Sequence, residues 1–70
     1  STLPKTLIDN AQAILNETRE VFAGGLYDMA RFFERKKKPL AAKIYYMATI
    51  ERYPESQGAR RAQEQMQKIS

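Results

Sequence analysis

The sequence of 70 residues predicts an all-α fold in which antiparallel helical hairpins pack side by side. Two observations lead to this class: apolar residues recur at intervals of three and four along most of the chain, and no segment alternates strictly between apolar and polar residues as a half-buried strand would. Prolines and a glycine pair separate the periodic segments. A chain of this length forms one domain at most, with a small core.

The first periodic segment, from Lys5 to Phe22, predicts an amphipathic helix of about 18 residues. Gly24 and Gly25 follow, and each costs about 1 kcal/mol relative to alanine inside a helix. We therefore expect a break or a kink at this pair, since a continuous helix would require packing that outweighs the cost. The apolar stripe of the segment consists of Leu7, Ile8, Ala11, Ile14, Leu15, Thr18, Val21 and Phe22.

The middle of the chain predicts a helix from Leu26 to Lys37 and another from Pro39 to Tyr53. Pro39 disfavours helical geometry in the residue before it and suits the first position of a helix. The helix that it begins is apolar around most of its circumference, so we expect a neighbouring helix on each side of it. Pro54 ends this helix.

The last segment predicts a helix over residues 57–69, for which Ser56 is a suitable N-cap. It would be the first helix of a following unit or a capping helix, and its strongly polar far side favours the capping role. Its apolar stripe is narrow and consists of Ala59, Ala62, Met66 and Ile69. The single predicted domain, residues 1–70, thus contains a flanking helix (5–22), a hairpin unit (23–56) and a capping or next-unit helix (57–69).

The spacing inside the hairpin unit is more specific than the hairpin itself. Small residues at two positions allow the helix backbones to approach closely, and Phe33 and Tyr46 fill the space between helices. The pattern resembles the signature of a tetratricopeptide repeat (TPR). The alternative is any helical hairpin with alanines and aromatic residues in its core, and Leu26 and Met29 would be core residues in either case. The spacing reads Leu26-x2-Met29-Ala30-x2-Phe33, then Ala42-x3-Tyr46, then Pro54.

A narrower resemblance rests on residues 26–35, on Ala41-Ala42 and on Tyr53-Pro54-Glu55-Ser56. These motifs resemble one repeat of the outer-membrane assembly lipoprotein (BamD-like) family of the bacterial barrel-assembly machinery, over residues 20–62. The chain departs from that family at Gly24-Gly25 and at the lysine run 36–38, where the family has an Arg-Gly turn. The family's lipid-bearing cysteine is also absent, so the resemblance implies an internal or C-terminal fragment on the periplasmic side of an outer membrane, with barrel-assembly proteins as partners. A cytoplasmic location stays open.

The candidate partner-binding residues are Tyr27, Arg31, Glu34 and Arg35. In repeats of this kind the first helix lines the concave surface, and tyrosine and arginine are enriched at binding hot spots. The alternative is a solvated face that only keeps the helix soluble. The basic turn of Lys36, Lys37 and Lys38 offers an anion-binding patch, or is an ordinary exposed turn. The exposed ends of the apolar stripes also make self-association of the chain a candidate interaction.

Composition narrows the function classes. The chain has no cysteine and no histidine, which are the commonest catalytic and soft metal-ligating residues, so we expect no enzyme, no metal and no cofactor. No apolar run is long enough to span a membrane, and residues 1–4 lack the pattern of a signal peptide. A protein–protein interaction scaffold is the first hypothesis.

The alternative function is a small basic helical nucleic-acid-binding module. It is suggested by the net charge of +4, the lysine turn and Arg60-Arg61. Against it, glutamates interleave with the basic residues, which do not gather on one helix face. A membrane-surface helix is a weaker alternative, because the polar side of the segment 5–22 carries charges of both signs.

Overall fold

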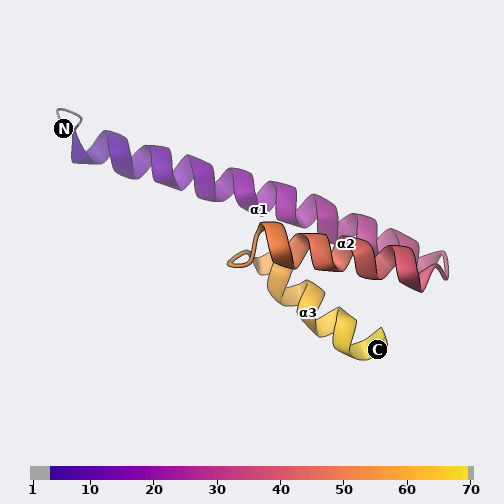
Figure 1. Ribbon diagram of the computed structural model, residues 1–70. Helices are drawn as coiled ribbons and strands as arrows, with labels where there is room; N and C mark the ends of the chain where they lie inside the picture. Colours follow the sequence, from indigo (N-terminus) through magenta and orange to yellow (C-terminus); the bar gives the residue numbers. More distant parts are fainter. Residues whose placement is uncertain (1–3, 70) are drawn as a thin grey trace.

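The computed structural model describes residues 4–69, which form three helices and no strands, so the predicted all-α class is confirmed (Figure 1). The helices are α1 (Lys5–Arg35), α2 (Pro39–Arg52) and α3 (Gln57–Ile69). Helix α2 runs back along the second half of α1, and α3 turns again beside both. The first half of α1 projects beyond them, which makes the molecule 53 Å long and only 17 by 13 Å across. Residues 1–3, part of the segment tested for a signal peptide, and residue 70, the predicted domain end, lie outside the described part.

The predicted break at Gly24-Gly25 is wrong, because α1 continues through both glycines without a positive φ angle. Helical contacts on either side of the pair hold the backbone in place: Ala23 is fully buried, and the Tyr27 ring packs against Tyr46 of α2. This packing outweighs the helix-propensity cost of about 2 kcal/mol for two glycines. The predicted flanking helix and the first helix of the hairpin unit are therefore one element.

The turn between α1 and α2 ends α1 at Arg35, two residues earlier than predicted. The Lys38 N–H donates to the carbonyl of Phe33 (2.9 Å) and the Lys37 N–H to that of Glu34 (3.0 Å). Lys37 has a φ of 61°, the left-handed geometry that this type of helix ending requires and that glycine usually supplies. Pro39 begins α2, as predicted.

The core lies where the three helices meet and consists of Ala30, Ala42, Tyr46 and Ala62, all fully buried. Three of these are signature positions, and their sizes have the predicted roles: the alanines allow close approach and Tyr46 fills the space. Phe33 stacks on Tyr45 with ring centroids 5.4 Å apart. Thr49, which the signature analysis did not include, is also fully buried and donates its hydroxyl to the Tyr45 carbonyl.

The core assignment of Met29 is wrong, since its side chain is 40% exposed. Met29 and Leu26 line an open, mainly apolar hollow that is bordered by Arg52 at the end of α2 and by Tyr53, and Leu26 is only half-buried there. Helix α2 contacts α1 and α3 as expected, but its third side is open and exposes Leu40, Ile44 and Met47. No helix among the described residues has the length and apolar character needed to cross a membrane.

Helix α3 begins at a close backbone contact with α1. A Cβ atom on Gly58 would lie 2.9 Å from the Ala23 carbonyl oxygen, so only glycine fits at this crossing. The Ala59 N–H donates to the Ser56 hydroxyl (2.9 Å), which confirms Ser56 as the N-cap. The Gln57 N–H donates to the Glu20 carboxylate of α1 at 3.0 and 3.3 Å. These contacts fix the direction of α3.

Candidate partner-binding surface

The predicted partner-binding residues form a row on α1. Tyr27, Arg31 and Glu34 lie one turn apart at spacings of four and three, so they share one face of the helix. All three are half-buried, whereas Arg35 is exposed in the last turn. The row borders α2 at the point where Tyr46 enters the core.

Intramolecular contacts tie this row to Tyr46. The Tyr46 hydroxyl donates to Glu34 Oε1, and Arg31 Nη1 lies 3.8 Å from the same oxygen. The Tyr27 ring lies over the Tyr46 ring with centroids 5.9 Å apart. The side chains of Tyr27, Arg31 and Glu34 are therefore held in place, and we name them together with Tyr46 the Tyr46 cluster.

Two groups of the cluster, Tyr46 and Arg31, have shifted pKa values. Burial, with the hydrogen bond to Glu34 as a second cause, raises the pKa of Tyr46 to about 12. The hydrogen bond with Tyr46 raises the pKa of Arg31 above its ordinary value. Tyr46 is thus a neutral donor at physiological pH, and Arg31 keeps its positive charge. A guanidinium has five N–H donors, and the part of Arg31 that reaches solvent can bind an anionic group.

The basic turn of Lys36, Lys37 and Lys38 is exposed throughout, as predicted. Lys36 Nζ lies 5.6 Å from the centre of the Phe32 ring, within the range of a cation–π contact. Lys37 provides the left-handed residue that ends α1. The turn therefore has a structural role, and its three ammonium groups add positive charge at the end of α1 where Arg35 also lies.

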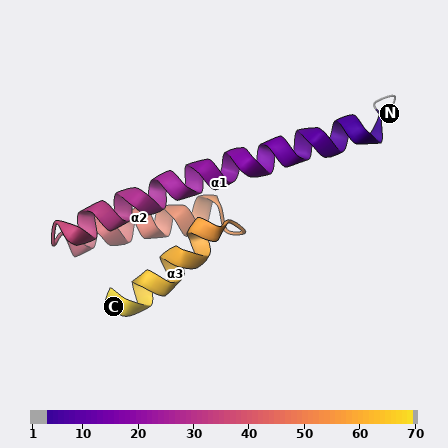
Figure 2. The same ribbon diagram turned by 180° about the vertical axis from the view of Figure 1, so that it is seen from behind.

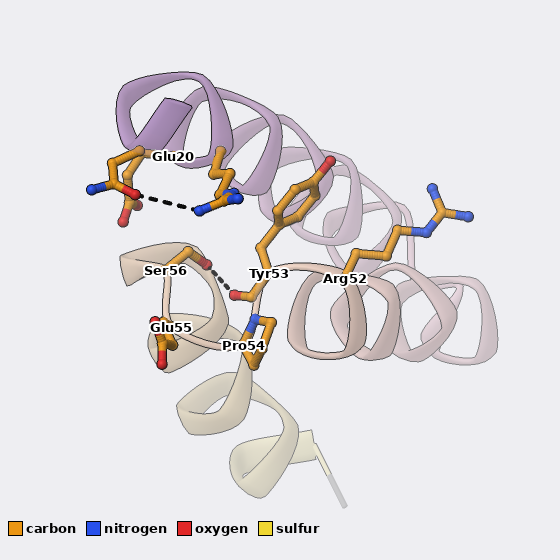
Figure 3. A pocket seen from close by; sticks show the side chains of 8 residues that line it. Glu20, Arg52, Tyr53, Pro54, Glu55 and Ser56 are labelled. Atoms are coloured by element: carbon orange, nitrogen blue, oxygen red, sulfur yellow. Dashed lines mark hydrogen bonds between the residues drawn. The ribbon is translucent and has the colours of Figure 1, made fainter. Parts of the chain in front are cut away.

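A further hollow on the surface was not predicted. It has a volume of about 520 Å³ and lies between α1 and the turn that joins α2 to α3 (Figure 3). Most of its polar side chains already have partners: Glu20 bonds to Gln57, Ser56 donates to the Tyr53 carbonyl (2.7 Å), and Arg19 donates to Asn16 (3.4 Å). Its lining is Asn16, Arg19, Glu20, Arg52, Tyr53, Pro54, Glu55 and Ser56.

These partners indicate that the hollow is a by-product of how α3 is anchored. Its two arginines and two glutamates balance in charge, so it favours neither anions nor cations. Sequence reasoning missed it because the Glu20–Gln57 contact joins residues 37 positions apart, and Glu20 has the pattern of a solvated helix residue. Within residues 4–69, no three histidine, cysteine, aspartate or glutamate side chains lie close enough together to hold a metal ion.

Comparison of the chain with protein-family models, with curated proteins and with solved structures finds no match. The residues and contacts of the chain itself are therefore the basis for a functional proposal. Among them, the Tyr46 cluster combines ordered aromatic and cationic side chains with exposure to solvent.

Proposed function

We propose that the chain is a non-enzymatic protein–protein interaction module of the TPR type. In this proposal the face of α1 that carries Tyr27, Arg31, Glu34 and Arg35 binds an acidic segment of another protein. The observation that carries the proposal is the placement of Arg31, whose partly exposed guanidinium lies 3.8 Å from the Glu34 carboxylate that accepts from Tyr46.

These side chains already make contacts within the molecule, and this supports a binding role over that of a face that only keeps the helix soluble. Immobilising a flexible side chain at an interface costs about 0.5 to 1.5 kcal/mol, and a side chain that is already ordered avoids much of that cost. Tyrosine and arginine are also the residue types that most often dominate binding energy. Tyr27 and Arg31 are therefore of the residue types found at binding hot spots, and their side chains are already restricted by intramolecular contacts.

The charge of the region supports an acidic partner. Between residues 31 and 38 the chain carries the arginines and lysines Arg31, Arg35, Lys36, Lys37 and Lys38, against a single carboxylate. That carboxylate, Glu34, already bonds to Tyr46 and pairs with Arg31. The net field at this end of α1 is positive and attracts negatively charged segments.

We further propose a place for this module in the assembly of outer-membrane proteins, on the periplasmic side of a bacterial outer membrane. The support is the resemblance of residues 26–35 and of Tyr53-Pro54-Glu55-Ser56 to the BamD-like family. The signature residues Ala30, Ala42 and Tyr46 occupy core positions at the meeting point of three helices, which is compatible with such a repeat.

The test is a titration of a fluorescein-labelled extended peptide of alternating glutamate and leucine with the chain. We expect Arg31→Gln to weaken binding by more than about tenfold, as for a hot-spot residue. Arg52→Gln, which removes the same charge at the hollow on another side of α1, is the matched control and should change affinity little. Equal weakening by both variants, or no binding at all, would contradict the proposal.

The same titration, with nucleic acid in place of the peptide, distinguishes the proposed peptide binding from the alternative nucleic-acid-binding function. Nucleic-acid binding weakens steeply as salt concentration rises, because phosphate contacts release counterions. We expect a labelled DNA duplex and a labelled RNA strand to bind more weakly than the peptide at physiological salt. Tighter binding of either would favour the nucleic-acid function instead.

A further inference from the structure

Helix α1 carries an exposed apolar stripe with a strict seven-residue repeat. Three apolar pairs recur at intervals of seven, and each is followed three positions later by a small residue. A repeat of seven keeps one seam of a helix facing a partner helix, as in coiled coils, whereas a helix on a globular core follows a period near 3.6. The pairs are Leu7-Ile8, Ile14-Leu15 and Val21-Phe22, and the small residues are Ala11, Thr18 and Gly25.

The stripe is largely uncovered in the described structure. All six members of the pairs are exposed, up to 70% for Val21, and Phe22 alone among them stacks on a ring of another element, Tyr53 (6.4 Å). The residues of α1 that face α2 and α3, such as Ala23 and Ala30, lie on the other side of the helix. Figure 2 shows the first half of α1 extending well past the rest of the molecule. A helical segment without tertiary contacts is marginally stable in water, so the segment needs a partner.

We propose that the partner is a second copy of the chain, with the two α1 helices packed antiparallel along this stripe. The sizes of the side chains favour this orientation. In a parallel pair each small residue would face its own equivalent and each large residue likewise, which leaves gaps and crowding in alternate layers. In an antiparallel pair Ala11 faces Val21 of the second copy, Thr18 faces Ile14, and Gly25 faces Leu7, so every layer combines a small residue with a branched one.

The surface around Gly25 has the shape that this arrangement requires. An open hollow of about 440 Å³ lies there, with a mainly apolar lining that α1 provides together with Arg52 and Tyr53. Apart from its chain neighbours and the adjacent backbone of the helix, no atom lies within 4 Å of the position that a Gly25 Cβ would take. The side chain of Leu7 from the second copy fills this hollow, which gives the glycine a role that the monomer does not.

The edges of the stripe also favour the antiparallel orientation. Ile8, Leu15 and Phe22 form one edge, and Asn10 and Glu17 form the other. Antiparallel helices bring like edges together, so the apolar edge is buried against itself, whereas a parallel pair would place Leu15 and Phe22 beside the polar edge of the partner. In the antiparallel pair the two Glu17 carboxylates lie near each other at the solvent-exposed edge, and their repulsion costs about 0.2 to 0.5 kcal/mol. This interface does not depend on the proposed peptide binding, because the Tyr46 cluster lies on another side of α1.

Sedimentation velocity and far-ultraviolet circular dichroism over a range of concentrations test the proposal. We expect a monomer–dimer equilibrium in which helix content rises with concentration as the first half of α1 is covered. Ile14→Glu should raise the dissociation constant by more than about tenfold. The matched control is Ile44→Glu on α2, where the isoleucine is 66% exposed against 62% for Ile14, and it should dimerise like the parent chain. Neither substitution touches the buried core, so both variants should fold.

Disulfide formation tests the orientation, since the chain has no cysteine of its own. We expect oxidation to cross-link an equimolar mixture of the Ala11→Cys and Val21→Cys variants and to leave each variant alone un-cross-linked. Cross-linking within each single variant would indicate a parallel pair and overturn the orientation. A chain that stays monomeric into the millimolar range, or that Ile14→Glu and Ile44→Glu affect equally, would overturn the proposal as a whole.

Discussion

The two halves of α1 form one continuous helix but are held in different ways. From Ala23 to Arg35 the helix is packed: Ala23 and Ala30 are fully buried, and the Tyr46 cluster joins the helix to α2. From Lys5 to Phe22 every residue is exposed, and the contacts with the rest of the molecule, Glu20 with Gln57 and Phe22 with Tyr53, lie at the end of this segment. Tertiary packing therefore stabilises the second half, while the first half depends on helix propensity and on whatever covers its stripe.

Truncation of Tyr46, which packs against the second half of α1, and of Ile14 in the first half should give the widest contrast. Tyr46→Ala removes the largest buried ring at the packed half and should cost about 3 to 5 kcal/mol of unfolding free energy, most of the stability of a chain this small. Ile14→Ala in the free half should cost less than about 0.5 kcal/mol at dilute concentration. Urea unfolding of both variants measures the difference, and equal losses would mean that the free half is also packed.

Alkaline pH should destabilise the packed half through Tyr46. The pKa of Tyr46 is about 12 in the folded chain and near 10 when unfolded, so the unfolded state loses its proton first as pH rises. Stability should be unaffected by this group below pH 10 and should fall by about 2 to 3 kcal/mol between pH 10 and 12. Urea unfolding at a series of pH values measures the slope. Tyr46→Phe should remove this part of the slope, and an unchanged slope in that variant would show that the effect does not come from Tyr46.

The contact at which the packed half begins can be broken with one methyl group. Gly58→Ala places a Cβ 2.9 Å from the Ala23 carbonyl oxygen, and neither backbone can move away without disturbing α3. Overpacking of this kind should cost about 1 to 3 kcal/mol. The midpoint of thermal unfolding reports the loss, and a stability equal to that of the parent chain would show that α3 shifts freely on α1.

Substitution in the glycine pair that joins the two halves should raise the stability of the monomer instead of lowering it. An added Cβ meets nothing within 4 Å at Gly24 or Gly25, so alanine at either position should stabilise the monomer by about 0.5 to 1 kcal/mol. The two variants should differ in the dimer, because Gly25 faces Leu7 of the second copy whereas Gly24 lies beside the stripe. Sedimentation velocity should show weaker dimerisation for Gly25→Ala only, and identical behaviour of the two variants would argue against the antiparallel contact.

The sequence predicts well what depends on local spacing. The start of α1, the proline at the start of α2, the Ser56 cap and the size pattern of Ala30, Ala42 and Tyr46 all follow from periodicity and capping preferences. The break at Gly24-Gly25 fails because propensity is a weak local term that packing on both sides overrides. The predicted burial of Met29 is wrong because periodicity shows that a face is apolar but not whether another helix covers it.

For the candidate site too, the sequence predicts local spacing along a helix but not the contacts between helices. The spacing places Tyr27, Arg31 and Glu34 on one face of a helix, but the bond from Tyr46 to Glu34 depends on how two helices meet. The Glu20–Gln57 contact and the Ala23–Gly58 approach likewise join residues far apart in sequence, and no local pattern marks them. The assignment of these residues to partner binding stays a prediction.

The continuity of α1 gives the proposed dimer a fixed length scale. At 1.5 Å per residue, the Tyr46 cluster lies roughly 20 Å along the helix from the centre of an antiparallel pair, so two copies would present their binding faces about 40 Å apart. A partner with two acidic segments at that separation would gain from effective concentration, and its avidity would exceed the affinity of either contact. The rigid helix through Gly24-Gly25 would then act as a molecular ruler that selects partners by the distance between their binding motifs.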